Sequence, residues 1–170
     1  MPTPCLLRIV AVALLVPAVA GVAGAQEAAS PPKSAAFIEG VTGLGQPDQK
    51  ALEEIDAAGY AAVIDLRGPD EDRGMPDERA AVEGLGMSYI ALPILGAGDV
   101  TYDNASALDR LLAQFDKPVL VHCGSGNRAG ALLALRAKLN GADNETALEA
   151  GRETGLTALE GVVKERLEER

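Results

Sequence analysis

Cysteine and histidine are scarce in this chain of 170 residues, which contains two cysteines and one histidine. Cys5 lies in an N-terminal segment that we expect to be cleaved off, so Cys123 would have no partner for an intramolecular disulfide. Cys123 and His122 alone cannot build a zinc site of cysteine and histidine ligands within one chain, and we expect no metal. Cys123 is therefore either a buried, inert thiol or a free, reactive one.

Basic and aromatic residues are also few. The chain has 15 lysines and arginines against 25 aspartates and glutamates, a net charge of −10, and 3% aromatic residues without a tryptophan. Such an acidic chain has no general electrostatic attraction for nucleic acid or an anionic membrane surface, so we expect neither as a partner. Any anion that the protein binds must be held by local geometry. The scarcity of aromatic side chains also argues against a deep binding slot lined by aromatic rings.

The first 25 residues have the pattern of a secretory signal peptide. Arg8 precedes an apolar run at residues 9–20, and Ala23 and Ala25 form a cleavage site of the A-x-A type. Pro17 interrupts the run, which is shorter than the ~20 residues of a membrane-spanning helix, so we expect no stable membrane insertion. The pattern predicts a periplasmic or secreted protein, with a linker at residues 26–35 and one domain at residues 36–170.

Short apolar runs alternate with helical patterns along the predicted domain. Strand-like composition is found at residues 61–66, 87–92 and 117–123, and more weakly at residues 36–39. Helical spacing is found at residues 48–58, 76–85, 103–115, 129–140, 144–153 and from about residue 157. The alternation predicts a single α/β domain whose central, mostly parallel sheet of about four to five strands is flanked by helices. In such sheets, ligands bind beyond the carboxyl ends of the strands.

The sequence HCGSGNRAG, residues 122–130, combines a cysteine, glycines and an arginine at the start of a helical pattern. Cys123 ends a predicted strand, and Gly124 and Gly126 permit backbone conformations in which successive amides point at one anion. Arg128 can hold two oxygens of an oxyanion with its planar guanidinium, and the following helix directs its positive dipole end at the loop. Amides and an arginine favour the nucleophilic thiolate. The motif predicts a reactive Cys123 beside an oxyanion site.

This stretch resembles the signature of the cysteine-dependent phosphatase superfamily, and most closely that of the bacterial beta-lactamase-hydrolase-like or dual-specificity-like protein phosphatases. The resemblance extends upstream through GLGQPD, AGYAAVIDLRGPDED and DERAAVEGLGMSYIALPI. It implies the dual-specificity phosphatase fold, a phosphocysteine intermediate at Cys123 and a phosphorylated protein or small molecule as substrate. It implies no metal and no organic cofactor. The phosphate would be bound by Gly124, Ser125, Gly126, Asn127 and Arg128.

Two features depart from the usual pattern of these phosphatases. Four residues rather than five separate Cys123 from Arg128, which is the spacing of rhodanese-type sulfurtransferases, and VIDLRGPDED also resembles a rhodanese segment. Ala129 stands where the common phosphatases have serine or threonine, and the Ser125 hydroxyl could replace that group in helping the thiolate leave. A sulfurtransferase that works through a Cys123 persulfide is therefore an alternative function. A non-catalytic module that binds phosphorylated ligands is a second alternative.

A phosphatase of this kind also needs an acid that protonates the leaving oxygen. Asp99 lies in LGAGDV, a glycine-flanked loop after a predicted strand, and we predict that it is this acid. Asp103 is a rival, but it falls near a predicted helix start, where acidic residues are common anyway. We interpret the acidic residues 70–72 as a solvated turn and His122 as a support of the cysteine loop.

Overall fold

The computed structural model describes residues 33–170. The predicted signal peptide and residues 26–32 of the predicted linker lie outside the described residues. Within residues 33–170, no helix combines the length and the apolar character needed to cross a bilayer.

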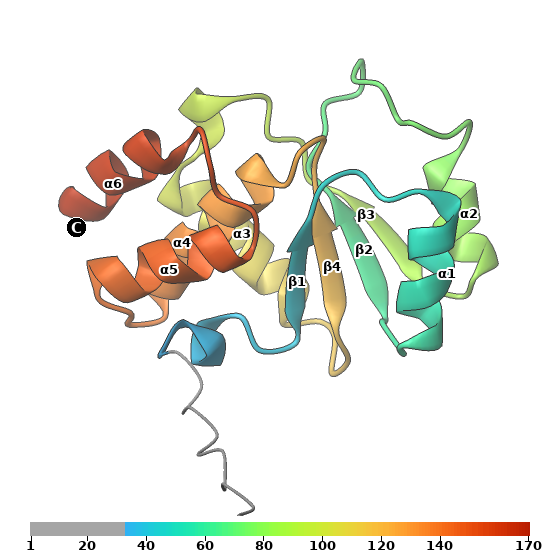
Figure 1. Ribbon diagram of the computed structural model, residues 1–170, viewed down its shortest axis with the longest axis horizontal. Helices are drawn as coiled ribbons and strands as arrows, with labels where there is room; N and C mark the ends of the chain where they lie inside the picture. The colour runs from blue at the N-terminus through green and yellow to red at the C-terminus, as the bar shows by residue number, and fades with distance from the viewer. Residues whose placement is uncertain (1–32) are drawn as a thin grey trace, which may run out of the picture. The chain divides into compact units, whose positions relative to one another are not determined.

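Four parallel strands form the sheet, in the order β1-β4-β2-β3 (Figure 1). They are β1 (Val41–Leu44), β2 (Ala62–Asp65), β3 (Ser88–Ala91) and β4 (Val119–His122). Every residue of the two central strands, β2 and β4, is buried, because helices cover both faces of the sheet. The register places the last residues of the strands side by side, at Leu44, His122, Asp65 and Ala91. Cys123, which follows His122, therefore lies at the carboxyl edge of the sheet.

The helices form layers on the two faces of the sheet (Figure 1). The helices on one face are α1 (Gln49–Ala57) and α2 (Glu78–Gly84). The helices on the other face are α3 (Tyr102–Leu112) and α4 (Asn127–Leu139). Two further helices, α5 (Asn144–Glu153) and α6 (Glu160–Glu168), pack on α4. α4 is thus the central helix of this half of the domain.

Three clusters of buried apolar side chains follow these layers. The cluster between the sheet and α1 and α2 includes Leu52, Val63 and Leu120. The cluster between the sheet and α3 and α4 includes Ile64, Leu108, Leu132 and Cys123 itself. The cluster beyond α4 includes Leu135, Leu148 and Val163. α4 contributes side chains to two of the three clusters, so the position of its first turn is fixed from both sides.

The start of α4 differs from the starts of α1, α2, α3 and α5. Those four helices begin at Asp48, Asp77, Thr101 and Asp143, whose side chains each accept a hydrogen bond from a backbone amide of the first turn. The N-cap of α4 is Gly126, which has no such side chain and has a φ of 87°. The first-turn amides of α4 are therefore not capped by the side chain of the N-cap residue and can bind an anion.

The first strand is the one wrong prediction among the regular elements. We expected a weak strand at residues 36–39, but residues Lys33–Phe37 form the 3-10 helix η1, and the strand begins at Val41. η1 is held against the helices by hydrogen bonds from Ser34 to Glu153 and from Arg136 to the Phe37 carbonyl. The true first strand, Val41–Leu44, pairs with β4. An apolar pattern in the sequence does not reveal such a pairing between distant segments.

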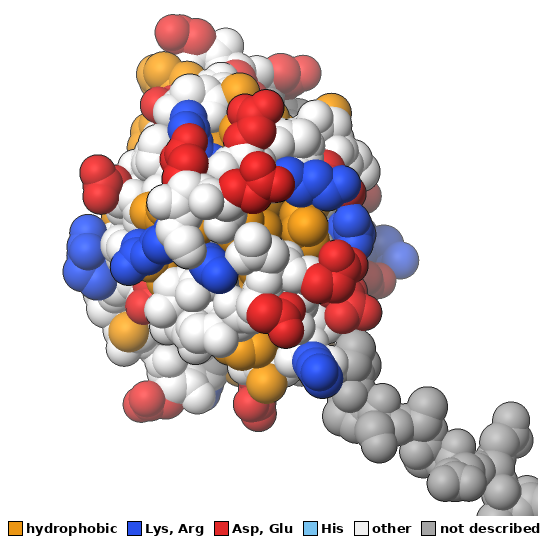
Figure 2. Space-filling model, turned by 90° about the vertical axis from the view of Figure 1, so that its left-hand side faces the viewer, with side chains coloured by type: hydrophobic (Ala, Val, Ile, Leu, Met, Phe, Trp, Pro, Cys, Tyr) orange, Lys and Arg blue, Asp and Glu red, His pale blue; other side chains and the backbone are white. Residues whose placement is uncertain are grey.

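The face formed by the C-terminal helices carries acidic and basic side chains next to one another (Figure 2). Arg152 forms ion pairs with Glu145 and Glu160, and Lys164 forms another with Glu160. Such exposed pairs contribute little to stability, because water and dissolved ions screen them. The hydrogen bonds from Arg152 and Lys164 nevertheless lower the pKa of Glu160 to about 2.

Candidate active site

Cys123 lies between the end of β4 and the loop that leads into α4, and its side chain is 1% exposed. The backbone amide of Gly126 donates a hydrogen bond to Sγ of Cys123 at 3.2 Å. An amide directed at sulfur stabilises a thiolate more than a thiol, because the thiolate is the better acceptor. The predicted arrangement of thiol, loop and helix start is therefore present in three dimensions.

The loop after Cys123 is held in place by the segment that follows β1. The Gln46 amide donates to the Gly124 carbonyl at 3.0 Å, and Gly45 and Ser125 form an antiparallel bridge. A Cβ atom at Gly126 would lie 3.3 Å from the Gly45 nitrogen. The positive φ of Gly126 favours glycine, and the close contact with Gly45 leaves little room for a side chain. Gly124 and Ser125 are exposed, so the loop is open to solvent on its outer side.

Asn127 uses its side chain to hold the connection between α5 and α6. Its Oδ1 accepts hydrogen bonds from the amides of Thr157 at 2.9 Å and Leu159 at 3.2 Å. Gly130 lies one turn later in α4, where a Cβ atom would be 2.2 Å from the Leu156 nitrogen. The α5–α6 connection is therefore packed directly against the start of α4. The Oδ1 atom of Asn127 therefore has a structural role, and its backbone amide lies at the start of α4, where an anion can bind.

Arg128 is bound at its outer end by Glu71. Its Nη1 and Nη2 donate to the two carboxylate oxygens of Glu71 at 2.6 Å each, and Nη1 also donates to the Ile94 carbonyl at 2.7 Å. The hydrogen bonds from Arg128 lower the pKa of Glu71 to about 2, and those same bonds are the largest cause of the raised pKa of Arg128. Cys123 is a further, smaller cause of the raised pKa of Arg128, because its side chain lies close to the guanidinium.

The interpretation of residues 70–72 as a solvated turn is therefore wrong for Glu71. Glu71 is 57 residues from Arg128 in the sequence, so no local spacing could have shown the contact. The Glu71 carboxylate also accepts a hydrogen bond from the Gly68 amide at 2.7 Å, which fixes it on the loop after β2. Asp70 and Asp72 are exposed, as expected for a turn.

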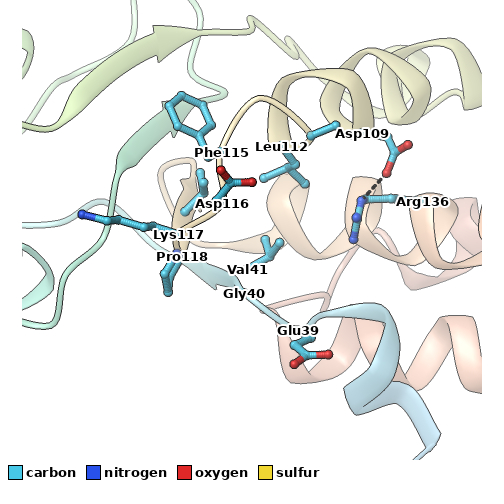
Figure 3. A pocket seen from close by; sticks show the side chains of 12 residues that line it. Glu39, Gly40, Val41, Asp109, Leu112, Phe115, Asp116, Lys117, Pro118 and Arg136 are labelled. Carbon is cyan, nitrogen blue, oxygen red and sulfur yellow. Dashed lines mark hydrogen bonds and ion pairs between the residues drawn. The ribbon is translucent and has the colours of Figure 1, made fainter.

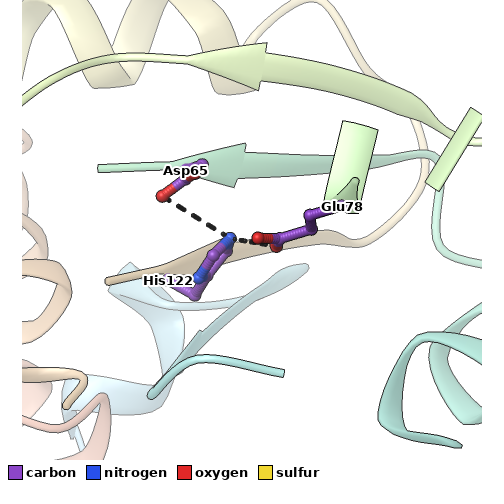
Figure 4. Close-up of side chains that lie close together, drawn as sticks. All are labelled: Asp65, Glu78 and His122. Carbon is purple, nitrogen blue, oxygen red and sulfur yellow. Dashed lines mark ion pairs between the residues drawn. The ribbon is translucent and has the colours of Figure 1, made fainter. Parts of the chain in front are cut away.

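His122 lies in a buried group of charged side chains (Figure 4). Its Nε2 is 2.9 Å from Oε1 of Glu78 and 3.8 Å from Oδ1 of Asp65. The angle between His122 Nε2 and Glu78 Oε1 does not allow a hydrogen bond, so these two side chains form an electrostatic contact only. His122 is 0% exposed and Glu78 3% exposed. The imidazole of this residue, which precedes the cysteine, is thus enclosed, and its supporting role stays a prediction.

Arg67 joins the two carboxylates of this group. Its Nε donates to Asp65 Oδ1 at 2.9 Å, its Nη2 donates to Asp65 Oδ2 at 3.0 Å, and Nη2 also contacts Glu78. Tyr89 donates to Asp65 at 2.6 Å, and Arg73 contacts the same carboxylate. Burial alone would raise the pKa of Asp65, but the hydrogen bonds from Arg67 and Tyr89 outweigh it and lower the pKa to about 2. Burial, and then the Asp65 contact, raises the pKa of Tyr89 to about 12.

One oxygen each of Asp65 and Glu78 and one nitrogen of His122 lie within 4.8 Å of one another, close enough in principle to share a metal ion. The carboxylates, however, already face the guanidinium groups of Arg67 and Arg73. The charges of these two carboxylates and two guanidinium groups balance. A divalent cation would have to displace Arg67, which is fully buried. These residues therefore fit an internal ion-pair network better than a metal centre. Sequence reasoning missed this network, although DLR within VIDLRGPDED contains two of its members.

Asp99 ends the short 3-10 helix η2 (Ala97–Asp99) and closes the loop after β3. Its Oδ2 accepts a hydrogen bond from the Leu95 amide at 2.7 Å, and its backbone carbonyl accepts one from the Asn104 side chain at 2.8 Å. This is the loop whose Ile94 carbonyl binds Arg128. The rival, Asp103, is exposed in the first turn of α3. Asp99 thus lies on the loop that contacts Arg128 through Ile94. Its role as an acid stays a prediction.

A cavity of about 420 Å³ lies at this edge of the sheet and is lined by Gly68, Pro69, Asp70, Glu71, Leu95 and Arg128. A second hollow, of about 380 Å³, lies at the opposite edge, beside the first residues of β1 and β4 (Figure 3). There Arg136 is bound to Asp109 at 2.7 Å and to the Phe37 carbonyl at 2.9 Å. Its guanidinium is used to hold α3 and η1 to α4, so the cavity beside Arg128 is the better candidate for a substrate site.

A buried thiol after a central parallel strand, with an arginine at the start of the following helix, is the arrangement that the resemblance to cysteine-dependent phosphatases implies. Solved structures with this fold include a phosphatase candidate from Neisseria meningitidis Z2491. That structure has a TM-score of 0.63 and 24% identity, and the match covers 74% of this chain and 89% of the other. PTPMT1 matches with a TM-score of 0.58 and 17% identity over 76% and 90% of the two chains. At these identities the similarity establishes the fold, which is the predicted dual-specificity-phosphatase-like α/β fold.

The sequence defines the family more narrowly. The family described as "Beta-lactamase hydrolase-like protein, phosphatase-like domain" matches residues 37–140, and the chain belongs to this family. A beta-lactamase hydrolase-like protein of Xylella fastidiosa (strain Temecula1) is 33% identical over 109 residues, which cover 62% of this chain and 25% of the relative. One of Agrobacterium fabrum is 30% identical over 112 residues, covering 64% and 26%. The chain thus spans about a quarter of the length of these relatives.

Proposed function

We propose that this protein is an exported cysteine-dependent phosphatase that hydrolyses phosphate monoesters of proteins or small molecules. The observation that carries the proposal is the position of Cys123. Its sulfur accepts a hydrogen bond from the amide of Gly126 at the uncapped start of α4, and Arg128 is oriented nearby by Glu71. Membership of a phosphatase-like family supports the same reaction class.

In the proposed first step, the Cys123 thiolate attacks the phosphorus of the ester. A sulfur–phosphorus bond forms while the bond between phosphorus and the ester oxygen breaks. In this step the loop amides and Arg128 would stabilise the negative charge on the three remaining phosphate oxygens: the Gly126 amide already faces the sulfur, and Nε of Arg128 is not used by Glu71. Asp99 is the proposed donor of the proton that the leaving oxygen takes up.

In the proposed second step, water attacks the phosphocysteine. The phosphorus–sulfur bond breaks, inorganic phosphate leaves and the Cys123 thiolate is restored, with the proton of the water taken up by the Asp99 carboxylate. Ser125 is exposed beside the cysteine, so its hydroxyl is our candidate for stabilising the departing thiolate in place of the side chain that Ala129 lacks. The two reaction steps together require no redox change and no co-reactant besides water.

The first test is phosphate release from p-nitrophenyl phosphate by the full chain. Cys123→Ser should abolish release, because a hydroxyl is a far weaker nucleophile than a thiolate at neutral pH. Arg128→Lys should reduce it strongly, since lysine cannot offer two parallel donors to the phosphate. Arg152→Lys is the matched control, because Arg152 forms its ion pairs on the C-terminal helices and should leave activity unchanged. Equal release by wild type and Cys123→Ser would refute the proposal.

A sulfurtransferase is the second candidate, and it is favoured by the four residues between Cys123 and Arg128. In that reaction the Cys123 thiolate would take the outer sulfur of thiosulfate and release sulfite, and cyanide would then remove that sulfur as thiocyanate and restore the thiolate. Thiocyanate formation that depends on Cys123, without phosphate release from any ester, would decide for this function. Binding of phosphorylated ligands with neither reaction would identify a non-catalytic binding module.

Export is proposed from the signal-peptide pattern of residues 1–25. Expression of the full chain in a bacterium with a periplasm should give a mature protein that begins at Gln26 in the periplasmic fraction. A cytoplasmic protein that retains Met1 would contradict this part of the proposal. The two parts are independent, because the reaction would follow from the cysteine loop in either compartment.

A further inference from the structure

Two large hydrophobic side chains are exposed among residues 33–170, and both border the cysteine loop. Leu44 is 40% exposed and Leu95 is 69% exposed. Leu44 ends β1, and its carbonyl accepts a hydrogen bond from the Cys123 amide at 3.4 Å. Leu95 follows Ile94, whose carbonyl binds Arg128. Of the two, Leu95 lines the cavity that contains Arg128. An apolar side chain therefore lines the cavity that contains Arg128, the arginine of the proposed active site.

The position of Leu95 is fixed on two sides. Its amide is bound by the Asp99 carboxylate at 2.7 Å, which holds the backbone of the loop. Its Cδ2 lies over Gly68, where a Cβ atom would come within 2.8 Å of it. Gly68 is in turn joined to Glu71, the partner of Arg128. The exposed side chain of Leu95 therefore packs against Gly68 at the wall of the cavity.

Exposure of a held leucine is unfavourable in the free protein, because apolar surface is more stable when removed from water. A ligand that covers Leu95 would recover that free energy on binding. The proposed chemistry says which part of a ligand reaches it. The ester oxygen must come close to Asp99, the proposed acid, whose carboxylate accepts a hydrogen bond from the Leu95 backbone amide, and Leu95 also lines the cavity beside Arg128. The carbon substituent of that oxygen therefore extends past Leu95.

We infer that Leu95 selects phosphate monoesters whose alcohol portion is apolar next to the ester oxygen. This inference rests on the proposed phosphatase function. Phosphate binding is assigned to the loop amides and Arg128, and Leu95 contacts the alcohol portion alone. Esters of small polar alcohols leave Leu95 uncovered and are poorer substrates for that reason.

The test compares 1-naphthyl phosphate and hexyl phosphate with glycerol 3-phosphate, using the full chain and its Leu95→Ser variant. Wild type should prefer both apolar esters. Leu95→Ser should lower kcat/KM about tenfold for the apolar esters, mainly through KM, and leave that for glycerol 3-phosphate unchanged. A fall for the naphthyl ester but not the hexyl ester would still support the inference and show that the pocket selects aryl groups.

Leu44→Ser is the matched control, because Leu44 is also an exposed leucine beside the cysteine loop but does not line the cavity. It should leave the preference between the esters unchanged. Equal kcat/KM ratios in wild type and Leu95→Ser would overturn the inference while leaving the phosphatase proposal in place. No phosphate release from any of the three esters by wild type would instead overturn the proposed function, and the inference with it.

Discussion

Replacement of Glu71 by glutamine tests whether this residue positions Arg128 for the reaction. In the structure the Glu71 carboxylate binds Nη1 and Nη2 of Arg128, at 2.6 Å each. Nε of Arg128 takes no part in these bonds, so it remains available to an anion. Glutamine keeps the shape and one accepting oxygen but loses the charge and the second acceptor. We predict that Glu71→Gln lowers the activity.

The size of the effect follows from the two hydrogen bonds and their exposure. Hydrogen bonds to charged groups contribute about 1.5–3 kcal/mol when well shielded. The side chains of Arg128 and Glu71 are 15% and 37% exposed, so water competes for both and weakens the two hydrogen bonds. In the glutamine variant one of these bonds is partly retained, because the side-chain oxygen still accepts. We therefore expect Glu71→Gln to lose about 1–2 kcal/mol of transition-state stabilisation, which corresponds to a roughly 5- to 30-fold decrease in kcat/KM.

The assay is kcat/KM for p-nitrophenyl phosphate, together with the inhibition constant of inorganic phosphate. Glu160→Gln is the control, because Glu160 binds Arg152 with a similar pair on the C-terminal helices. If Glu71 acts through Arg128, the double variant Glu71→Gln with Arg128→Lys should lose less activity than the sum of the single losses. The pKa of Glu71 is about 2, so the effect of the variant should be constant between pH 5 and pH 8.

An unchanged or increased kcat/KM in Glu71→Gln would refute this reasoning. An increase, with tighter phosphate binding, would mean that the carboxylate competes with phosphate for Arg128. A decrease that is fully additive with Arg128→Lys would place the effect of Glu71 elsewhere, for example on the loop that it holds through the Gly68 amide.

Two further predictions concern stability. The pKa of Asp65 is about 2, below that of an unfolded aspartate, so its contribution of roughly 2 kcal/mol is complete above about pH 4 and is lost as the pH falls towards 2. Urea unfolding between pH 5 and pH 2 should show a steeper loss for wild type than for Asp65→Asn, and parallel profiles would contradict the network. Gly126→Ala should cost more in unfolding free energy than Gly59→Ala and abolish activity, because both glycines have a positive φ but only Gly126 is crowded. Equal costs and retained activity would show that the loop tolerates a side chain.

The parts of the site that are local in sequence could be predicted from it. The strand that ends at His122, the glycines and Arg128 lie within one turn of chain, so spacing alone places the thiol, the amides and the guanidinium together. The apolar character of β2 and β4 likewise follows from their burial on both faces. The order of the strands does not follow from such local patterns, because it depends on pairing between distant segments.

The partners of these residues could not be predicted in the same way. Glu71 binds Arg128 across 57 residues, and Glu78 lies beside His122 only because α2 packs over the carboxyl end of the sheet. An acidic run looks the same in sequence whether it is solvated or paired. The Asn127 side chain is a related case, since its role in holding the α5–α6 connection depends on a contact 30 residues away.

The central claim is that Cys123 attacks phosphorus, and the phosphocysteine itself tests it most directly. The full chain should be mixed with p-nitrophenyl phosphate, quenched in acid within one turnover and examined by mass spectrometry, with Cys123→Ser treated in parallel. We predict a phosphoryl group on the peptide that contains Cys123, in wild type alone and in an amount equal to the burst of nitrophenol. A persulfide on Cys123 after thiosulfate treatment, with no phosphoryl adduct from the ester, would contradict the claim.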